Sequence, residues 1–178
     1  MRIIRGKYKT RRFKVAKSFP SRPTTDFAKE GLFNIIENQY DIDELKVLDL
    51  CSGTGNIAIE FLSRDAIHVT AVDSNYNCIK NLKKIAKDLD CESDLDIIKS
   101  DVLKYLPKVD AKFDLIFSDP PFAYEKHEEI VKLVFDRGLL EENGILIIEH
   151  GRETNLENIT HFQNMRKYGN VMFSFFSR

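Results

Sequence analysis

The sequence contains no tryptophan, only three cysteines and no long hydrophobic run. Three cysteines without a Cys-x-x-Cys motif argue against a disulfide framework and against a cysteine zinc site. No apolar stretch approaches the roughly 20 residues that span a bilayer, and the basic start lacks the apolar core of a signal peptide. We therefore expect reduced thiols, no metal site, no membrane partner and a cytoplasmic location.

The first 25 residues contain no acidic side chain and nine of the Lys and Arg residues. The rest of the chain has 18 basic and 28 acidic residues, so the net charge of −1 combines a basic segment with an acidic body. Apolar and aromatic residues alternate with the charges in RIIRGKYKTRRFKV. This pattern is typical of a small hairpin that binds a polyanion, and a solvated tail is the alternative. The residues expected to contact a nucleic acid are Arg5, Lys7, Arg11, Arg12 and Arg22.

The length of 178 residues, with 43% apolar and 31% charged residues, fits one soluble domain. Within it we expect a basic arm over 1–22 and a catalytic core over 23–178. Apolar segments alternate with segments of helical spacing, which predicts an α/β fold with a parallel sheet covered on both faces. The expected strands are 46–50, 67–73, 95–100, 113–119 and 144–150, with two more around Gly169-Asn170. The expected helices start after Thr24 or Thr25 and cover 56–64, 75–89 and 124–140.

Glycines and acidic residues lie where the expected strands end, which is where open α/β sheets bind ligands. Gly53 and Gly55 allow a tight turn and a close approach of the backbone to a ligand. Asp73 could accept hydrogen bonds from two ribose hydroxyls, and Asp101 could accept one from an adenine amino group. The residues expected to bind the cofactor are Asp49, Ser52, Gly53, Gly55, Asn56, Asp73, Asp101, Ser118 and Asp119.

The glycine loop by itself also fits the relaxed dinucleotide fingerprint, as Gly53-x-Gly55-x-x-Ala58. However, Asp49 lies close to this loop and disfavours a diphosphate, whereas it suits the positive sulfonium of S-adenosylmethionine. The chain also lacks a second mononucleotide-binding half. S-adenosylmethionine is therefore the expected cofactor, and a nicotinamide-dependent oxidoreductase is the disfavoured alternative.

The segment Asp119-Pro120-Pro121-Phe122 follows the fourth expected strand. Consecutive prolines fix φ and have no backbone N–H, so the nearby carbonyls are free to accept hydrogen bonds from a ligand. A carboxylate, a carbonyl and an aromatic face together suit the exocyclic amino group of a nucleobase. Hydrogen bonds from that amino group would orient its nitrogen toward an incoming methyl group. The residues expected to be catalytic are Asp119, Pro120 and Phe122.

The segments VLDLCSGTGN, VTAVD, SDVL and DLIFSDPPF resemble motifs of class I S-adenosylmethionine-dependent methyltransferases that act on amino groups. The N-terminal basic segment with RPTTDFAKEGLFNII resembles the bacterial family that methylates guanine N2 in 16S ribosomal RNA. The resemblance covers nearly the whole chain. It implies a Rossmann-like sheet of seven mostly parallel strands with the last strand antiparallel, and an RNA substrate within the small ribosomal subunit or its assembly intermediate. We expect a monomer.

Several interpretations remain open at this stage. Adenine-N6 DNA or RNA methyltransferases and glutamine-N5 methyltransferases share the Asp-Pro-Pro-aromatic motif, and a non-catalytic RNA-binding or assembly protein is a further alternative. His127 is expected to be a solvated helix residue near Phe122. Glu149 and His150 fit the lining of a pocket and structural hydrogen bonding equally well.

Overall fold

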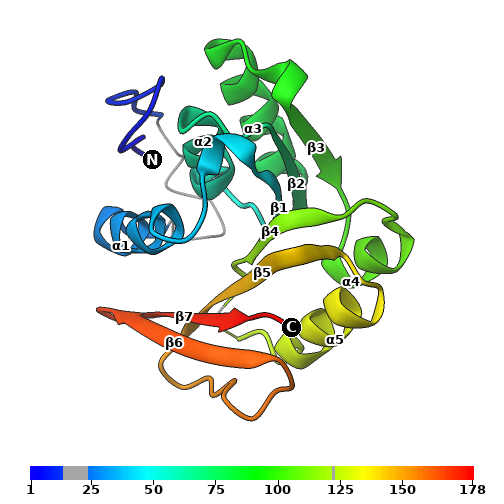
Figure 1. Cartoon of the computed structure of the whole chain (residues 1–178). Helices are drawn as coiled ribbons and strands as arrows, with labels where there is room; N and C mark the ends of the chain where they lie inside the picture. The colour runs from blue at the N-terminus through cyan, green and yellow to red at the C-terminus, as the bar shows by residue number, and fades with distance from the viewer. Residues whose placement is uncertain (14–23, 122) are drawn as a thin grey trace.

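The computed structural model describes residues 1–13, 24–121 and 123–178, which form a sheet between two layers of helices (Figure 1). The sheet has seven strands in the order β3-β2-β1-β4-β5-β7-β6. The pairs from β3 to β5 are parallel, and β7 runs antiparallel to both β5 and β6. The predicted α/β class, with a mostly parallel sheet and an antiparallel last strand, is confirmed.

The strands lie close to the segments that the sequence predicted. The fifth strand begins four residues earlier than expected, because the chain turns at Gly138 (φ +62°) and joins the sheet through an irregular stretch between Leu140 and Ile145. The strands are β1 Lys46–Leu50, β2 His68–Asp73, β3 Leu95–Lys99, β4 Phe113–Ser118, β5 Leu140–Gly151, β6 Phe162–Tyr168 and β7 Val171–Phe176.

The helices also follow the predictions, with two differences. The helix predicted over 124–140 is shorter in the structure, where it starts at His127 and ends at Asp136. A short helix after Asp101 was not expected from the sequence. The α-helices are α1 Asp26–Glu37, α2 Asn56–Ser63, α3 Tyr76–Leu89, α4 Val102–Tyr105 and α5 His127–Asp136. Single 3-10 turns cover Ile42–Glu44, Glu92–Asp94 and Leu106–Lys108.

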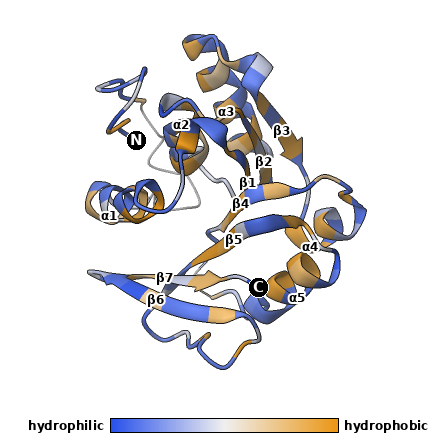
Figure 2. Ribbon diagram, viewed as in Figure 1, coloured by the Kyte–Doolittle hydropathy of each residue, from blue (hydrophilic) through white to orange (hydrophobic). Residues whose placement is uncertain are grey.

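Apolar residues occur in the strands and in the helices beside them (Figure 2), and buried apolar side chains form two clusters. Val47 and Leu48 are adjacent in β1, yet they belong to separate clusters on opposite faces. Helices α1, α2 and α3 contribute to the cluster of Val47, and α4 and α5 contribute to that of Leu48. Because both faces of the central strands are buried, their sequences are almost wholly apolar rather than alternating.

A fully buried ion pair lies between α1 and α2. Lys29 Nζ contacts Glu60 Oε2 at 2.9 Å, and both side chains have no solvent exposure. The same ammonium donates to the carbonyl of Arg2 and to Asn56 Oδ1, at 2.6 and 2.9 Å. With three acceptors around one ammonium, the buried charge keeps its hydrogen bonds, which reduces the cost of taking it out of water.

The N-terminal segment is attached to the body by the other acceptors of this cluster. Glu60 accepts hydrogen bonds from the backbone N–H groups of Ile4 and Arg5, at 2.9 and 3.0 Å. Within 1–13, the predicted small hairpin is present, with an antiparallel bridge between Arg2 and Arg12 and a turn between them. Backbone hydrogen bonds join its two arms, from Ile3 N to the Arg11 carbonyl at 3.1 Å and from Phe13 N to the Met1 carbonyl at 3.0 Å, and Glu60 holds the hairpin against α2.

Among the described residues, no helix has both the length and the apolar character needed to cross a membrane.

Candidate functional site

A cavity of about 550 Å³ opens at the carboxyl ends of the parallel strands. Its volume lies within the roughly 300–1,000 Å³ of small-molecule sites. The order of the strands reverses here, since β1 lies between β2 and β4, and such switch points are where open α/β sheets bind ligands. The lining residues are Cys51, Gly53, Asp73, Ser74, Asn75, Cys78, Ser100, Asp101, Val102, Asp119, Pro120, Pro121, Tyr124 and Glu149.

The glycine loop after β1 forms one wall of this cavity. Gly53 and Gly55 both have positive φ, at +51° and +78°, a conformation that glycine adopts without strain. A Cβ on Gly55 would also lie 2.4 Å from Leu82 Cδ1 in α3, so the close approach of this loop to the helix requires glycine. Gly55 is the N-cap of α2, and the amino end of that helix therefore lies directly behind the loop.

Asp73 joins the loop to the end of β2. Its Oδ2 accepts a 2.8 Å hydrogen bond from Gly53 N, and its Oδ1 accepts one of 2.7 Å from Asn75 N. Each carboxylate oxygen can accept a further hydrogen bond, because each has a second lone pair. The side chain is thus fixed at the wall of the cavity, with acceptor capacity left for a ligand.

Asp101 also lines the cavity, at the end of β3. Its Oδ1 accepts hydrogen bonds from Leu103 N and Lys104 N, at 3.0 and 3.2 Å, and caps the unexpected helix α4. Capping fixes the orientation of the carboxylate, so the predicted acceptor for an amino group is held in place by the fold.

Asp119 and the two prolines form another part of the cavity wall. The backbone N–H of Asp119 donates to the Leu50 carbonyl at 3.1 Å, which extends the pairing of β4 with β1 by one residue. Burial raises the pKa of its carboxyl well above the usual range, and the neighbouring Glu149 and Asp49 carboxylates raise it further. Phe122, predicted to be catalytic, lies outside the described residues, as does Arg22.

Asp49 lies beneath the loop and outside the large cavity. It is buried, and its Oδ2 accepts a 3.0 Å hydrogen bond from Ala58 N in α2. Burial raises the pKa of this carboxyl to about 8, with smaller contributions from Asp73 and Glu149. Its position predicts an indirect electrostatic influence on the cavity.

The remaining predicted cofactor residues are close to the cavity without lining it. Asp49, Ser52 and Asn56 surround a small adjoining space of about 20 Å³, together with Gly53 and Asp119. The Asn56 side chain is engaged by Lys29 and by the Thr24 carbonyl, so its contacts are structural. Ser118 is buried and lines none of these spaces.

Glu149 is the functional candidate that the sequence left undecided. It lies near the end of β5, is 3% exposed and lines the large cavity together with Asp119. Its Oε2 accepts a 2.7 Å hydrogen bond from Thr24 Oγ1, in the segment that leads into α1. Burial raises the pKa of Glu149 to about 7. The sequence signal that pointed to Glu149 was its position as an acidic residue at the end of the fifth expected strand.

The interpretation of His127 as a solvated residue is wrong. Its ring is 4% exposed and lies edge-on to Tyr124 and to His150, with centroids 5.4 and 6.4 Å away. The helix α5 begins at this residue, and its first turn packs against β5 instead of facing solvent. Burial, with a smaller contribution from His150, lowers the pKa of His127.

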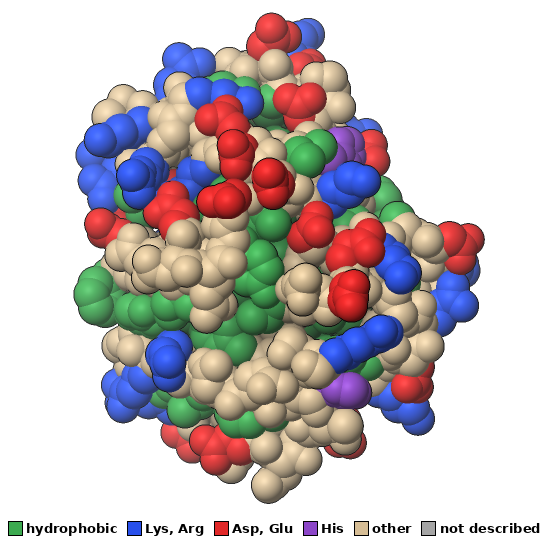
Figure 3. Space-filling view, viewed as in Figure 1, with side chains coloured by type: hydrophobic (Ala, Val, Ile, Leu, Met, Phe, Trp, Pro, Cys, Tyr) green, Lys and Arg blue, Asp and Glu red, His purple; other side chains and the backbone are tan. Residues whose placement is uncertain are grey.

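The predicted RNA contacts lie on a surface of mixed charge. Lys and Arg side chains gather over the N-terminal segment, with acidic side chains beside them (Figure 3). Arg5 pairs with Glu37 at 2.9 Å, and Lys7 pairs with Asp65 at 3.3 Å. Arg11 donates to the Asp88 carbonyl, and Arg12 is exposed. Part of the basic charge therefore holds the segment on the acidic body.

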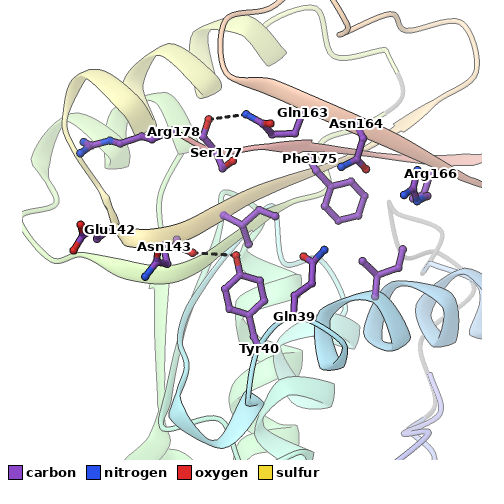
Figure 4. A pocket seen from close by; sticks show the side chains of 13 residues that line it. Gln39, Tyr40, Glu142, Asn143, Gln163, Asn164, Arg166, Phe175, Ser177 and Arg178 are labelled. Carbon is purple, nitrogen blue, oxygen red and sulfur yellow. Dashed lines mark hydrogen bonds between the residues drawn. The ribbon is translucent and has the colours of Figure 1, made fainter.

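A second cavity, of about 370 Å³, lies between the C-terminal end of α1 and strands β6 and β7 (Figure 4). The Tyr40 hydroxyl donates to the Asn143 carbonyl at 3.0 Å along its edge. Its polar side chains are mostly exposed, and it contains none of the glycines or acids predicted to act. We therefore place the candidate site in the larger cavity at the carboxyl ends of the strands.

The chemistry of the larger cavity suits a cationic nucleoside. Carboxyl groups of Asp73, Asp101, Asp119 and Glu149 line it, whereas no Lys or Arg of the described ranges does. A diphosphate would meet these acids with repulsion, and a sulfonium would be attracted. Within the described part of the chain, no cluster of three or more His, Cys, Asp or Glu side chains is arranged to hold a metal ion.

Comparison with known proteins adds independent information. A family model described as "Conserved hypothetical protein 95" matches residues 1–177. A Bacillus subtilis (strain 168) protein named "Putative rRNA methyltransferase YlbH" is 35% identical over 159 residues, covering 88% of this chain and 85% of that protein. "Ribosomal RNA small subunit methyltransferase D" of Buchnera aphidicola subsp. Baizongia pistaciae is 33% identical over 155 residues, covering 87% and 78%.

A solved structure extends the likeness to the fold. The structure titled "Putative methyltransferase yhhF from Escherichia coli" superposes with a TM-score of 0.87 at 25% identity, and the match covers 100% of this chain and 97% of that one.

Proposed function

The chain belongs to the Conserved hypothetical protein 95 family, and from this premise we propose that it methylates ribosomal RNA. The names of the relatives support methyl transfer to RNA of the small subunit. S-adenosylmethionine is the cofactor. The finer proposal is that the acceptor is the exocyclic N2 of one guanine in 16S ribosomal RNA, in the subunit or in its assembly intermediate.

The observation that carries the proposal is the presence of Asp73 and Asp119 in one cavity, on strands at either side of β1. When bound, S-adenosylmethionine supplies an electrophilic methyl group on a positively charged sulfur. Asp73 is proposed to accept hydrogen bonds from the ribose hydroxyls, and the glycine loop to approach the rest of the cofactor closely. Asp101 is proposed to accept a hydrogen bond from the adenine amino group.

Asp119 is proposed to act on the other reactant. The amino nitrogen of guanine is a poor nucleophile, because its lone pair is delocalised into the ring. A hydrogen bond from this amino group to Asp119 would orient the nitrogen and favour a pyramidal geometry as the N–C bond forms. Pro120 and Pro121 have no backbone N–H, so no donor from them competes with the amino group. The base would leave its helix to reach this wall.

The basic N-terminal segment is proposed to bind RNA phosphates outside the cavity, through Arg5, Lys7, Arg11, Arg12 and Arg22. The exposed Arg12 supports this role. The ion pairs of Arg5 and Lys7 indicate that RNA would have to share these side chains with Glu37 and Asp65.

The test is methyl transfer from tritiated S-adenosylmethionine to three substrates: 30S subunits that lack the modification, their naked 16S RNA, and DNA. Nucleoside analysis of the product separates N2-methylguanosine from N6-methyladenosine, the product of the alternative adenine-N6 activity. We expect label in N2-methylguanosine of 16S RNA and no label in DNA. Label in adenine, or in DNA, would refute the finer proposal. Comparison of 30S subunits with naked RNA identifies the form of the substrate.

A further inference from the structure

Glu149 and Asp119 occupy adjacent positions at the ends of two paired strands. Ser118 of β4 lies directly opposite Ile148 of β5 in the parallel register. Asp119 and Glu149 are the next residue of each strand, so the two side chains leave the sheet on the same face and line the same cavity. The backbone of Asp119 is held to Leu50, and the side chain of Glu149 is held to Thr24. The pair is therefore placed by the sheet and not by a loose loop.

Among the residues that the structure describes, the surroundings of this pair contain acids and no partner cation. Among the described residues, Glu149 Oε2 has the Thr24 hydroxyl as its donor, and no Lys, Arg or His forms an ion pair with either carboxyl. The titratable groups that line the same spaces are Asp49 in β1, Cys51 after β1, Asp73 at the end of β2, Cys78 in α3, Asp101 before α4 and Tyr124 before α5. His127 and His150 lie on the α5 side of β5, and burial lowers the pKa of each.

Two carboxyl groups that line one cavity do not both ionise readily, since the second charge is repelled by the first. Burial raises the pKa of Glu149 to about 7, and the Glu149 carboxylate contributes to the raised pKa of Asp119. Glu149 is therefore near the midpoint of its titration at neutral pH, and the protons of two such interacting carboxyls belong to both residues together.

We propose that Glu149 is a positioning residue that acts through Asp119, and that the two carboxyls form a pair which receives the proton released on methylation. This inference rests on the proposed function. The amino nitrogen gives its lone pair to the new N–C bond, and the electrons of the broken C–S bond remain on sulfur. One N–H proton moves to an ionised carboxylate of the pair. The additional proton leaves to solvent through the open cavity.

The first experiment needs no activity. The carboxyl C=O stretching band in the infrared spectrum reports protonated carboxyl groups directly. Because Asp49 has its own raised pKa, the spectra are recorded in an Asp49→Asn background, with Glu149→Gln, Asp119→Asn and, as a control on the exposed start of β5, Glu142→Gln. We expect a band near pH 7 that either pair substitution removes and that Glu142→Gln leaves unchanged. Absence of the band, or its persistence in Glu149→Gln, would overturn the pair.

The second experiment measures single-turnover methyl transfer to the RNA substrate against pH. Glutamine keeps an oxygen for the Thr24 hydroxyl and removes only the charge. Loss of that charge lowers the pKa of Asp119, so the pH midpoint of the rate in Glu149→Gln should move down by about one pH unit. The plateau rate should fall by less than in Asp119→Asn, because Asp119 keeps its carboxylate and accepts the proton as a weaker base. Cofactor affinity and thermal stability should remain close to those of the wild type.

The outcomes separate the two proposals. A purely structural Glu149 would change stability and leave the pH midpoint in place, and this result would refute the positioning role. If the wild-type protein methylates no RNA while the infrared band depends on both carboxyls, the carboxyl pair is supported and the proposed RNA substrate is refuted. If RNA is methylated and the infrared band is independent of Glu149, the proposed RNA substrate is supported and the carboxyl pair is refuted.

Discussion

The backbone N–H of Gly53 donates a 2.8 Å hydrogen bond to Oδ2 of Asp73, twenty residues later in the chain. This contact joins the loop after β1 to the end of β2, and thereby sets the shape of one wall of the cavity. Because the same carboxylate is proposed to bind the ribose, substitution of Asp73 affects both the ligand and the loop.

Replacement of Asp73 by Ala should weaken S-adenosylmethionine binding by about ten-fold or more, since hydrogen bonds to a charged acceptor contribute roughly 1.5–3 kcal/mol. Asp73→Asn keeps an acceptor for Gly53 and should lose less affinity. Titration calorimetry on both folded variants measures this. Unchanged affinity in Asp73→Ala would remove Asp73 from the cofactor site.

Replacement of Asp119 by Ala should abolish most of the turnover and leave cofactor affinity within a few fold, because Asp119 is assigned to the target amino group. Asp114→Ala, on the same strand and outside the cavity, is the matched control, and its turnover should stay near that of the wild type. The measurement is single-turnover methyl transfer alongside cofactor calorimetry. Near-normal transfer by the Asp119 variant is incompatible with the proposed chemistry.

We expect the exposed cations of the N-terminal segment to bind RNA phosphates, and we expect Arg5 and Lys7 also to hold the segment on the body. Lys9 and Arg12 are exposed, so the double alanine variant should lower the log–log salt slope by about 0.7–0.9 for each lost phosphate contact and leave the melting temperature unchanged. The Arg5 and Lys7 double variant should also lower the melting temperature slightly, because it breaks two ion pairs with the body. RNA binding at several salt concentrations tests this, and identical slopes in all three proteins would identify the segment as a solvated tail.

Asp49 should make stability depend on pH in a direction opposite to that of an ordinary carboxylate. Its pKa is raised from 3.8 to about 8 in the folded chain, so the folded state favours the protonated form. Its stabilising effect is therefore complete below about pH 4 and is lost as the pH rises to about 8. Asp49→Asn, which keeps an acceptor for Ala58 N, should be more stable than the wild type above pH 8 and similar to it near pH 4. Urea unfolding at both pH values measures the difference, and an equal difference at the two would contradict the assignment.

Much of the fold follows from local pattern. The apolar runs at Lys46–Leu50 and Phe113–Ser118 specify buried parallel strands, and Thr25, whose Oγ1 accepts from Ala28 N, starts α1 where a capping residue was expected. The ends of β5 and α5 were misplaced because Gly138 and the irregular pairing after Leu140 act through neighbours in the sheet. Propensity decides which element forms, and tertiary pairing decides where it ends.

The sequence also determined which acids and glycines gather at one end of the sheet, since strand ends are local features and parallel strands share a direction. Only the tertiary structure decided how they are used. Thr24 meets Glu149 across 125 residues of sequence, and Arg5 is held by Glu60 across 55. In the folded chain, burial raises the pKa of Glu149. Asn56 is in contact with Lys29, and Asp49 lies outside the wall of the large cavity. Such effects depend on distance and solvent exclusion between remote segments, which no local pattern encodes.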